Sequence, residues 1–306
     1  MEFFNPNSKV DFMGARRWTA LFSILIFVVS IGALAIHGLK WGLDFTGGTQ
    51  IEVSYPQSVD LSTIRENLSH AGFKEAQVVS YGTSKDVLIS IAPREDQDQS
   101  HLVDKVMSAL PGAVKQRVDF VGPQVGKELA NKGALAVLVS LLATMIYIAM
   151  RFEYRLAVSS AVALVHDPVL ILGVFAFFGI EFDLKALAGL LAVIGYSLND
   201  TIVVFDRVRE NFIKIRRSSS IEIMNTSINQ TLSRTIMTSV LTLCVVVSLF
   251  VYGGETIYGF SLALIIGIII GTYSSIYVAG ALAVAMGLDR KDFMPSERNK
   301  ELDSRP

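Results

Sequence analysis

The residues best placed to do chemistry are two carboxylates inside apolar segments. Asp200 falls within residues 186–205, a run that is otherwise uncharged, and Asp167 lies twelve residues beyond Arg155. A carboxylate at the centre of a membrane-spanning helix costs about 2.5 to 3.5 kcal/mol on insertion scales, so it usually faces a partner or a water-filled path. Asp167 also stands directly before Pro168, where the missing backbone donor can loosen a helix. We therefore predict an ion-coupled membrane protein.

Other polar and small residues accompany these carboxylates in the apolar segments. Asn199 precedes Asp200, and Arg234 begins a stripe at helical spacing that continues through Thr235, Thr238, Ser239 and Thr242. Arg234 has two interpretations that we keep open: an internal charge, or a side chain that reaches back to the membrane interface. Gly267 and Gly271 have the spacing of closely packed membrane helices, so helix packing is the interpretation we favour for them.

The composition indicates a membrane protein. Hydrophobic residues make up 51% of the 306 residues, and only 18% are charged, against about 25% in soluble domains. The net charge of -1 argues against a nucleic-acid binder, and the single cysteine, Cys244, excludes an intrachain disulfide. A membrane span needs about 20 apolar residues. Six segments meet that length: 19–39, 133–150, 156–180, 184–205, 235–254 and 256–288.

The basic residues predict the orientation of these spans. Lys and Arg gather in the short connections that would share one side, at Lys9, Arg16, Arg17, Arg151, Arg155, Arg207, Arg209, Lys214, Arg216, Arg217, Arg290 and Lys291. Because cytoplasmic loops carry the excess of basic residues, residues 1–18, the loop 206–233 and the tail 289–306 are predicted to be cytoplasmic. The first span resembles a signal peptide, but its apolar run continues to Leu39, which favours a retained anchor.

Residues 40–132 then form a segment on the outer face of the membrane, and their pattern predicts a small folded α+β domain. Strand and helix patterns alternate in the order βαββαβ, with Asp60 as the cap of the first helix. That order is ferredoxin-like. The six-span bundle itself comprises 133–288 and the first span. His70 and His101 have no ligand-spaced neighbours, so no metal site and no catalytic cluster are expected there.

The sequence contains no phosphate-binding loop. The nearest candidate, from Gly122 to Glu128, has three residues between its glycines where four are needed, and a glutamate where Ser or Thr should follow the lysine. Nucleotide hydrolysis is therefore rejected as the energy source. No cofactor is expected.

Four motifs in order resemble the SecD/SecF family of bacterial protein-export membrane proteins, and its SecF members in particular. They are GLDFTGGT with Gly42, Asp44, Gly47 and Gly48; VGPQVGKEL with Gly122, Pro123 and Gly126; IGYSLNDTIVVFDRVREN from Ile194; and TLSRTIMTSVLTL from Thr231. With six spans and one outer domain after the first span, the resemblance covers most of the chain. This family belongs to the resistance-nodulation-division superfamily, so six spans would be half of its usual twelve.

The resemblance implies a function and partners. Such proteins work with SecD beside the SecYEG channel of the bacterial inner membrane, where they use the proton gradient to help an exported, unfolded polypeptide leave on the periplasmic side. The coupling ion would be the proton. Asp200 and Arg234 match the family positions implicated in proton conduction, and Asn199, the other half of the Asn-Asp pair, is included in the predicted proton relay. Asp167 is a further candidate whose role stays open, because HDP departs from the expected pattern.

On this basis an ionised Asp200 near Arg234 would favour a closed arrangement of helices, and protonation would remove the attraction that offsets their burial. Two other classes stay open, a half-size proton-coupled efflux transporter and a structural subunit that conducts no protons. One half of a twelve-span architecture would leave a packing face exposed, and the Gly267/Gly271 surface is the predicted contact with SecD.

Overall fold

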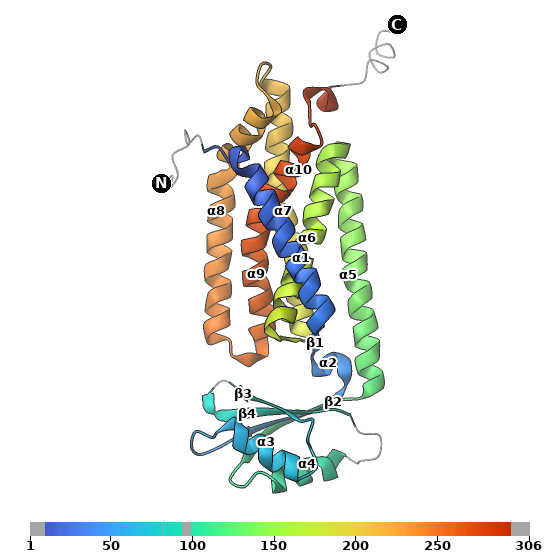
Figure 1. The fold of residues 1–306 in the computed structure, drawn as a ribbon, viewed down its shortest axis with the longest axis vertical. Helices are drawn as coiled ribbons and strands as arrows, with labels where there is room; N and C mark the ends of the chain where they lie inside the picture. Colours follow the sequence, from blue (N-terminus) through green and yellow to red (C-terminus); the bar gives the residue numbers. More distant parts are fainter. Residues whose placement is uncertain (1–9, 82, 94–98, 295–306) are drawn as a thin grey trace.

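Six long helices form the body of the molecule, and a small sheet domain lies at one end (Figure 1). The computed structural model describes residues 10–81, 83–93 and 99–294. Every one of these six helices is long and apolar enough to cross a membrane, which confirms the predicted six-helix membrane fold. They are α1 (Arg16–His37), α5 (Pro123–Arg151), α6 (Tyr154–Phe178), α7 (Leu184–Lys214), α8 (Ser220–Tyr252), and α9 (Tyr258–Ser274), which continues through the π-helical segment Ser275–Ala279 into α10 (Gly280–Ala285).

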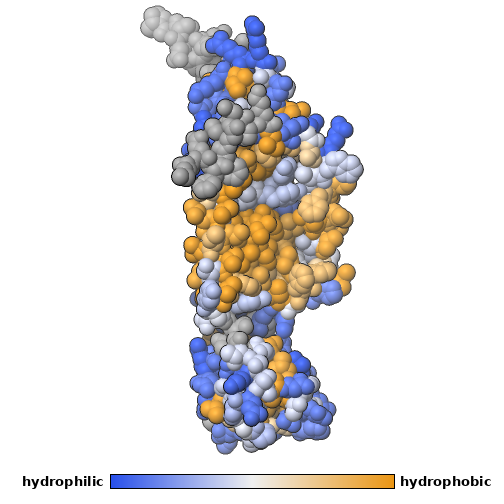
Figure 2. Space-filling model, turned by 90° about the vertical axis from the view of Figure 1, so that its left-hand side faces the viewer, coloured by the Kyte–Doolittle hydropathy of each residue, from blue (hydrophilic) through white to orange (hydrophobic). Residues whose placement is uncertain are grey.

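The helices divide into an inner and an outer set. In their most apolar stretches α6, α7 and α9 are 56%, 50% and 44% buried, whereas α1, α5 and α8 are only 17%, 11% and 17% buried. Figure 2 shows the result on one face, an apolar band across the bundle between hydrophilic surfaces at both ends. The outer helices therefore offer apolar side chains to lipid or to another protein.

Glycines allow α7 and α9 to approach closely. A methyl group added at Gly267 would overlap the Val193 side chain, and one added at Gly271 would lie 2.9 Å from Ser197 Cβ. Both glycines are buried. The packing role predicted for this pair is thus confirmed, but the packing is internal. The expectation that the Gly267/Gly271 surface meets a partner is wrong, because α7 of the same chain already covers it.

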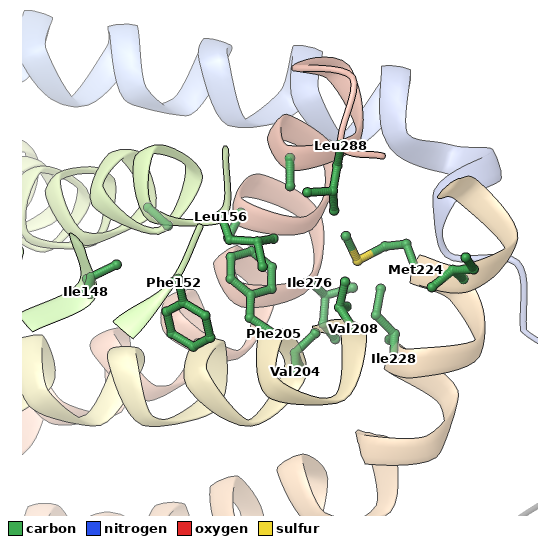
Figure 3. Close-up of a cluster of buried hydrophobic side chains, with 14 of the residues drawn as sticks. Ile148, Phe152, Leu156, Val204, Phe205, Val208, Met224, Ile228, Ile276 and Leu288 are labelled. Carbon is green, nitrogen blue, oxygen red and sulfur yellow. The ribbon is translucent and has the colours of Figure 1, made fainter. Parts of the chain in front are cut away.

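A hydrophobic cluster fixes the end of the bundle at which the described chain begins and ends, here called the terminal end (Figure 3). The rings of Phe152 and Phe205 meet edge to face with centroids 6.1 Å apart. Met224 of α8 and Ile276 of the π-helical segment pack in the same cluster. Met13 completes it, and its backbone N–H donates to the Asn225 side chain at 2.9 Å. The first described residues are therefore anchored to α8.

The sheet domain has the predicted βαββαβ order. Its elements are β2 (Gly48–Ser54), α3 (Leu61–His70), β3 (Gln77–Tyr81), β4 (Thr83–Ile91), α4 (Gln99–Ser108) and β5 (Val114–Val121). The strand order is β3-β4-β2-β5, and every neighbouring pair is antiparallel. Alternate residues of β2 and β4, such as Ile51, Val53 and Ile89, point into a core shared with α3 and α4. Those two helices cover the face turned away from the bundle (Figure 1).

Two glycine motifs, far apart in the sequence, interlock where the sheet domain joins the bundle, here called the joint. Gly47 has a φ of +73°, and a Cβ there would lie 2.8 Å from Pro123 Cα. A Cβ at Gly126 would lie 2.8 Å from the Gly47 nitrogen. Gly48, at φ +130°, opens β2, Gly122 precedes α5 as its N-cap, and Pro123 occupies its first turn. Only glycine allows the two backbones this close at these positive φ angles.

Short elements beside the joint belong to the bundle rather than to the sheet domain. β1 (Lys40–Trp41) pairs in parallel with β6 (Glu181–Phe182), and Gly42 caps α2 (Leu43–Thr46). The rings of Phe45 and Phe182 stack with centroids 6.2 Å apart. The sheet domain proper is therefore 48–121, shorter than the predicted 40–132.

Several predicted boundaries differ from the helices observed. α5 begins at Pro123 rather than near 133, and the predicted loop 206–233 is mostly helix, because α7 runs to Lys214 and α8 starts at Ser220. The last predicted span, 256–288, is interrupted by the π-helical segment. Hydropathy marks the apolar stretch of a helix, and these helices continue beyond it with polar residues.

Candidate functional site

Asp167 is the centre of a polar cluster that joins the three inner helices. Its side chain is 1% exposed. The Ser197 hydroxyl of α7 and the Ser274 hydroxyl of α9 both donate to Oδ2, the latter at 2.8 Å, and His166 Nδ1 lies 2.9 Å from Oδ1. A carboxylate offers about four acceptor positions, so these contacts satisfy most of them. Asp167, whose role the sequence left open, is the best-connected carboxylate inside the bundle among the described residues.

His166 extends this cluster toward α1. Its ring stacks on Phe27 of α1, with centroids 5.9 Å apart and planes 5° from parallel. Nδ1 is engaged with Asp167, while Nε2 is buried and has no hydrogen-bond partner among the described residues. An ionisable ring thus lies between the inner carboxylate and the outer helix.

The helices that carry the Asp167 cluster are irregular at this depth. Pro168, inside α6, cannot donate a backbone hydrogen bond to the preceding turn. The π-helical segment starts at Ser275, directly after Ser274. Such π-helical turns widen the helix locally and recur at functional sites. The backbone around Asp167 is therefore less tightly held than in a regular helix pair.

Asp200 occupies a second polar cluster, between α7 and α8. Its side chain is 3% exposed, and Oδ2 has no hydrogen-bond partner among the described residues. Two residues of α8 interact with this carboxyl group, Ser239 through its hydroxyl and Arg234 through its charge. Ser239 Oγ lies 2.8 Å from Thr272 Oγ1 of α9 and accepts from the Tyr196 hydroxyl at 3.4 Å. The predicted burial of Asp200 is confirmed, and its surroundings are hydroxyl groups.

Arg234, predicted to lie near Asp200, forms no direct ion pair with it. Its side chain is exposed on α8, and it makes no ion pair within 4.0 Å with any described carboxylate. The reason is the rotation of α8, which turns Ser239 rather than Arg234 toward α7. Arg234 is near enough to Asp200 for its charge to act on the carboxyl group, but the two side chains form no contact pair. The closed arrangement expected from this attraction stays a prediction.

Asn199 also lies outside the cluster. It is exposed, whereas Asp200 is buried, because consecutive residues of a helix point about 100° apart. Ala188, Ala192 and Gly195 are exposed at helical spacing on the same side of α7. No atom lies within 4 Å of a Cβ added at Gly195. An inner helix thus leaves one narrow stripe of small residues uncovered, here called the small-residue stripe.

The Asp167 and Asp200 clusters meet on α7. Ser197 and Asp200 are three residues apart, a spacing that places Cβ atoms about 5 to 6 Å from each other on a helix. On α9, Thr272 belongs to one cluster and Ser274 to the other. Sequence reasoning identified these polar positions but not their partners. The sequence signal that could have grouped them is their similar depth within the apolar runs.

Carboxylates hold the end of α7 next to the sheet domain, here called the domain end. Asp183 Oδ1 accepts from the Ala186 N–H at 2.7 Å, and Asp44 Oδ2 accepts from the Leu184 N–H at 3.0 Å. Helix N-termini favour such negative groups. Burial raises the pKa of Asp183 and that of the neighbouring Glu181. The motif residue Asp44 therefore links the joint to the helix that carries Asp200.

Comparisons with known proteins identify relatives over nearly the whole chain. The family model for the protein export membrane protein SecD/SecF, C-terminal, matches 102–289, and the SecD/SecF GG motif matches 32–59. The protein translocase subunit SecF of Vibrio alginolyticus is 48% identical over 94% of both chains. That of Pseudomonas aeruginosa is 43% identical over 97% of this chain and 98% of its own.

Solved structures agree with these relatives. SecDF from Thermus thermophilus, described as a translocon-associated membrane protein, is 36% identical with a TM-score of 0.85 over 93% of this chain. SecDF in a super-membrane-facing form is 35% identical, with a TM-score of 0.69 over 97% of this chain. This chain spans 40% of the length of either SecDF chain. Because both family models match and these SecF relatives align over at least 94% of both chains, the chain belongs to the SecD/SecF family of protein export membrane proteins.

Proposed function

We propose that this protein is the SecF-type subunit of a bacterial inner-membrane export machinery. It works with a SecD-type partner beside a SecYEG-type channel, and it uses the proton gradient to assist late, periplasmic-side steps in the export of an unfolded polypeptide. The names of its relatives support the translocase role, and the SecDF chains, of which this chain matches 40%, support a SecD-type partner.

The burial of Asp200 carries the proton-coupling part of the proposal. Its carboxylate is 3% exposed within the bundle, has one oxygen without a hydrogen-bond partner in the described chain, and forms no ion pair within 4.0 Å there. An ionised carboxylate in such a place is costly unless a partner or water reaches it. The charged and protonated forms therefore favour different helix arrangements, and that difference is what coupling requires.

α7 is connected directly to the sheet domain, so its movement can be transmitted there. Asp44 binds the first turn of α7, and the same short motif continues through Gly47 into β2. A shift of α7 that follows protonation of Asp200 would pull on this connection and change the position of the sheet domain. One proton crossing 100 mV supplies about 2.3 kcal/mol, which suits repeated small movements rather than one long pull.

The uncovered parts of α7 and α8 suit a membrane partner. The small-residue stripe, which ends at Asn199, lets another helix approach closely, as small residues do at membrane helix interfaces. Arg234 is exposed on the neighbouring helix and has no carboxylate within 4.0 Å in the described chain. We infer that the SecD-type partner packs on this stripe and that one of its acidic groups pairs with Arg234.

The experiment compares Asp200→Asn with Asp206→Asn. Both substitutions remove one negative charge from α7, but Asp206 is 41% exposed and pairs with Arg151 at 2.6 Å. Export of a secreted substrate into inverted vesicles is measured with and without a proton gradient. We expect Asp200→Asn to insert normally, to keep ATP-driven entry and to lose the stimulation by the gradient, while Asp206→Asn keeps it.

Two results would count against this proposal. If Asp200→Asn still responds fully to the gradient, the coupling role of Asp200 is wrong and Asp167 becomes the next candidate. If vesicles that contain the unsubstituted chain and its partner show no proton flux, the chain is a structural subunit rather than a coupled one.

A further inference from the structure

A long groove separates α1 from the inner helices in the half of the bundle nearer the terminal end. Figure 1 shows α1 running obliquely across the bundle at this place. The groove has a volume of about 850 Å³, and its walls come from α1, α6, the π-helical segment and α10, with Met145 contributed by α5. Ile24 and Phe27 form one wall, and Val162 and Val165 the other. Because Val162 and Val165 remain 44% and 39% exposed, the groove is an uncovered apolar surface.

Positive charge is concentrated at one end of this groove. Arg16 and Arg17 lie in its wall, eleven and ten residues before Phe27 on the same helix, and no acidic side chain is among the described residues that line it. Arg16 is held in place because its guanidinium donates to the Met13 carbonyl at 2.9 Å. Trp18 beside them is 77% exposed. Tryptophan is enriched at the level of lipid headgroups, so the arginines mark that level.

The opposite end of the groove is poor in polar groups. Ser23 Oγ is already engaged with the Tyr273 hydroxyl at 2.8 Å. His166 Nε2 is the buried polar atom of the wall that has no partner within the described chain. A stable buried water needs two to four polar partners. The groove therefore suits a hydrocarbon chain better than a column of water.

We propose that the groove binds one anionic phospholipid. An acyl chain lies between α1 and α6, and the phosphate lies between Arg16 and Arg17. Bulk lipid tails are as apolar as the groove wall, so burial of the chain by itself gives little preference over the surrounding bilayer. Retention and selectivity rest on the two arginines, because the guanidinium group matches phosphate oxygens in a bidentate geometry. The lipid site does not depend on the coupling role proposed for Asp200.

The test places a fluorescent bimane label in the groove at Val165→Cys, in a Cys244→Ser background that leaves no other thiol. The full chain is reconstituted in phosphatidylcholine vesicles that contain a small fraction of brominated phosphatidylglycerol or of brominated phosphatidylcholine. Leu138→Cys on α5, which is 53% exposed and lies outside the groove, is the control position. We expect the anionic lipid to quench at least about threefold more than the neutral lipid at Val165 and equally at Leu138.

Charge variants assign the preference to the arginines. Arg16→Gln with Arg17→Gln should abolish the preference at Val165, whereas Arg216→Gln with Arg217→Gln, an exposed pair between α7 and α8, should leave it intact. Ala161→Trp, which fills the groove without changing charge, should remove the preference as well. Because Arg16 and Arg17 remain in this variant, loss of the preference would be due to the filled groove and not to a change of charge.

Three outcomes would overturn the proposal. The first is equal quenching by both lipids at Val165. The second is quenching at Val165 by aqueous iodide, which would show a water-filled groove. The third is protection of Val165 from every quencher when a SecD-type partner is present, which would show that protein covers the groove.

Discussion

At the residue scale, the two buried carboxylates differ in the number of side chains that contact their oxygens. Asp167 has contacts from three side chains, whereas one oxygen of Asp200 has none in the described chain. The sequence predicted the burial of Asp200 and suggested that of Asp167, because both lie deep in apolar runs. It could not predict their partners, since these depend on how α7, α8 and α9 are rotated about their axes. Arg234 shows the same limit, because its two interpretations differ only by such a rotation.

The first prediction follows from the different number of contacts that Asp167 and Asp200 make. Asp167→Ala leaves the Ser197 hydroxyl without its side-chain acceptor and His166 Nδ1 without its partner, while the Ser274 hydroxyl keeps the Gly271 carbonyl at 3.2 Å. A buried polar group left unpaired costs about 1 to 3 kcal/mol. Asp200→Ala removes fewer contacts. We expect the thermal midpoint of the purified protein in detergent to fall by roughly 4 to 8 °C more for Asp167→Ala, about 2 kcal/mol. An equal or larger fall for Asp200→Ala would contradict this account.

At the element scale, the apolar runs predicted which helices exist but not where they end. α5, α7 and α8 all continue past their apolar stretch, because a helix that extends into water can carry polar residues without an insertion cost. The caps fix the ends instead. Ser219 and Glu222 form a capping box at the start of α8, and Gly122 with Pro123 starts α5. Both signals stand in the sequence beside the apolar runs.

The second prediction contrasts two glycines of the inner helices. Gly267→Ala would push a methyl group into Val193, which is fully buried and stiff at χ1, so α7 and α9 must separate. We expect a loss of roughly 1 to 3 kcal/mol in unfolding free energy, the usual cost of overpacking. Gly195→Ala meets no atom within 4 Å and should be neutral or slightly stabilising. Thermal unfolding of both variants in detergent checks this, and equal effects would refute it.

At the scale of the whole molecule, the joint is the feature that the sequence could not predict. The GLDFTGGT and VGPQVGKEL motifs were recognisable separately, but their contact brings together residues 47 and 123, at the two ends of the sheet domain. The pairing of β1 with β6 is similar, because it joins the end of α1 to the connection between α6 and α7. Such contacts arise from the folded arrangement of all six helices. No local pattern encodes them.

The third prediction concerns the pH dependence of this region. Burial raises the pKa of Glu181, so its contribution to stability is present at acidic pH and is lost as pH rises through the folded-state pKa. Glu181→Gln should therefore unfold at a higher temperature than the unsubstituted protein at pH 8, with a smaller difference near pH 4. Glu128→Gln is the matched control. The pKa of Glu128 is lowered by Lys132, so this substitution should not stabilise the protein at pH 8.

The last prediction concerns the orientation of the molecule in its membrane. The sheet domain and the described chain ends lie at opposite ends of the bundle (Figure 1), and basic residues such as Arg151, Arg207 and Arg290 lie at the terminal end. Because basic connections stay in the cytoplasm, we expect the sheet domain to face the periplasm. Single cysteines at exposed Thr63 and Ser218, in a Cys244→Ser background, report the two ends. A membrane-impermeant maleimide should label Thr63→Cys in spheroplasts and Ser218→Cys only in inverted vesicles. Labelling of both from the same side would refute the six-span arrangement, and exchanged sides would refute its orientation alone.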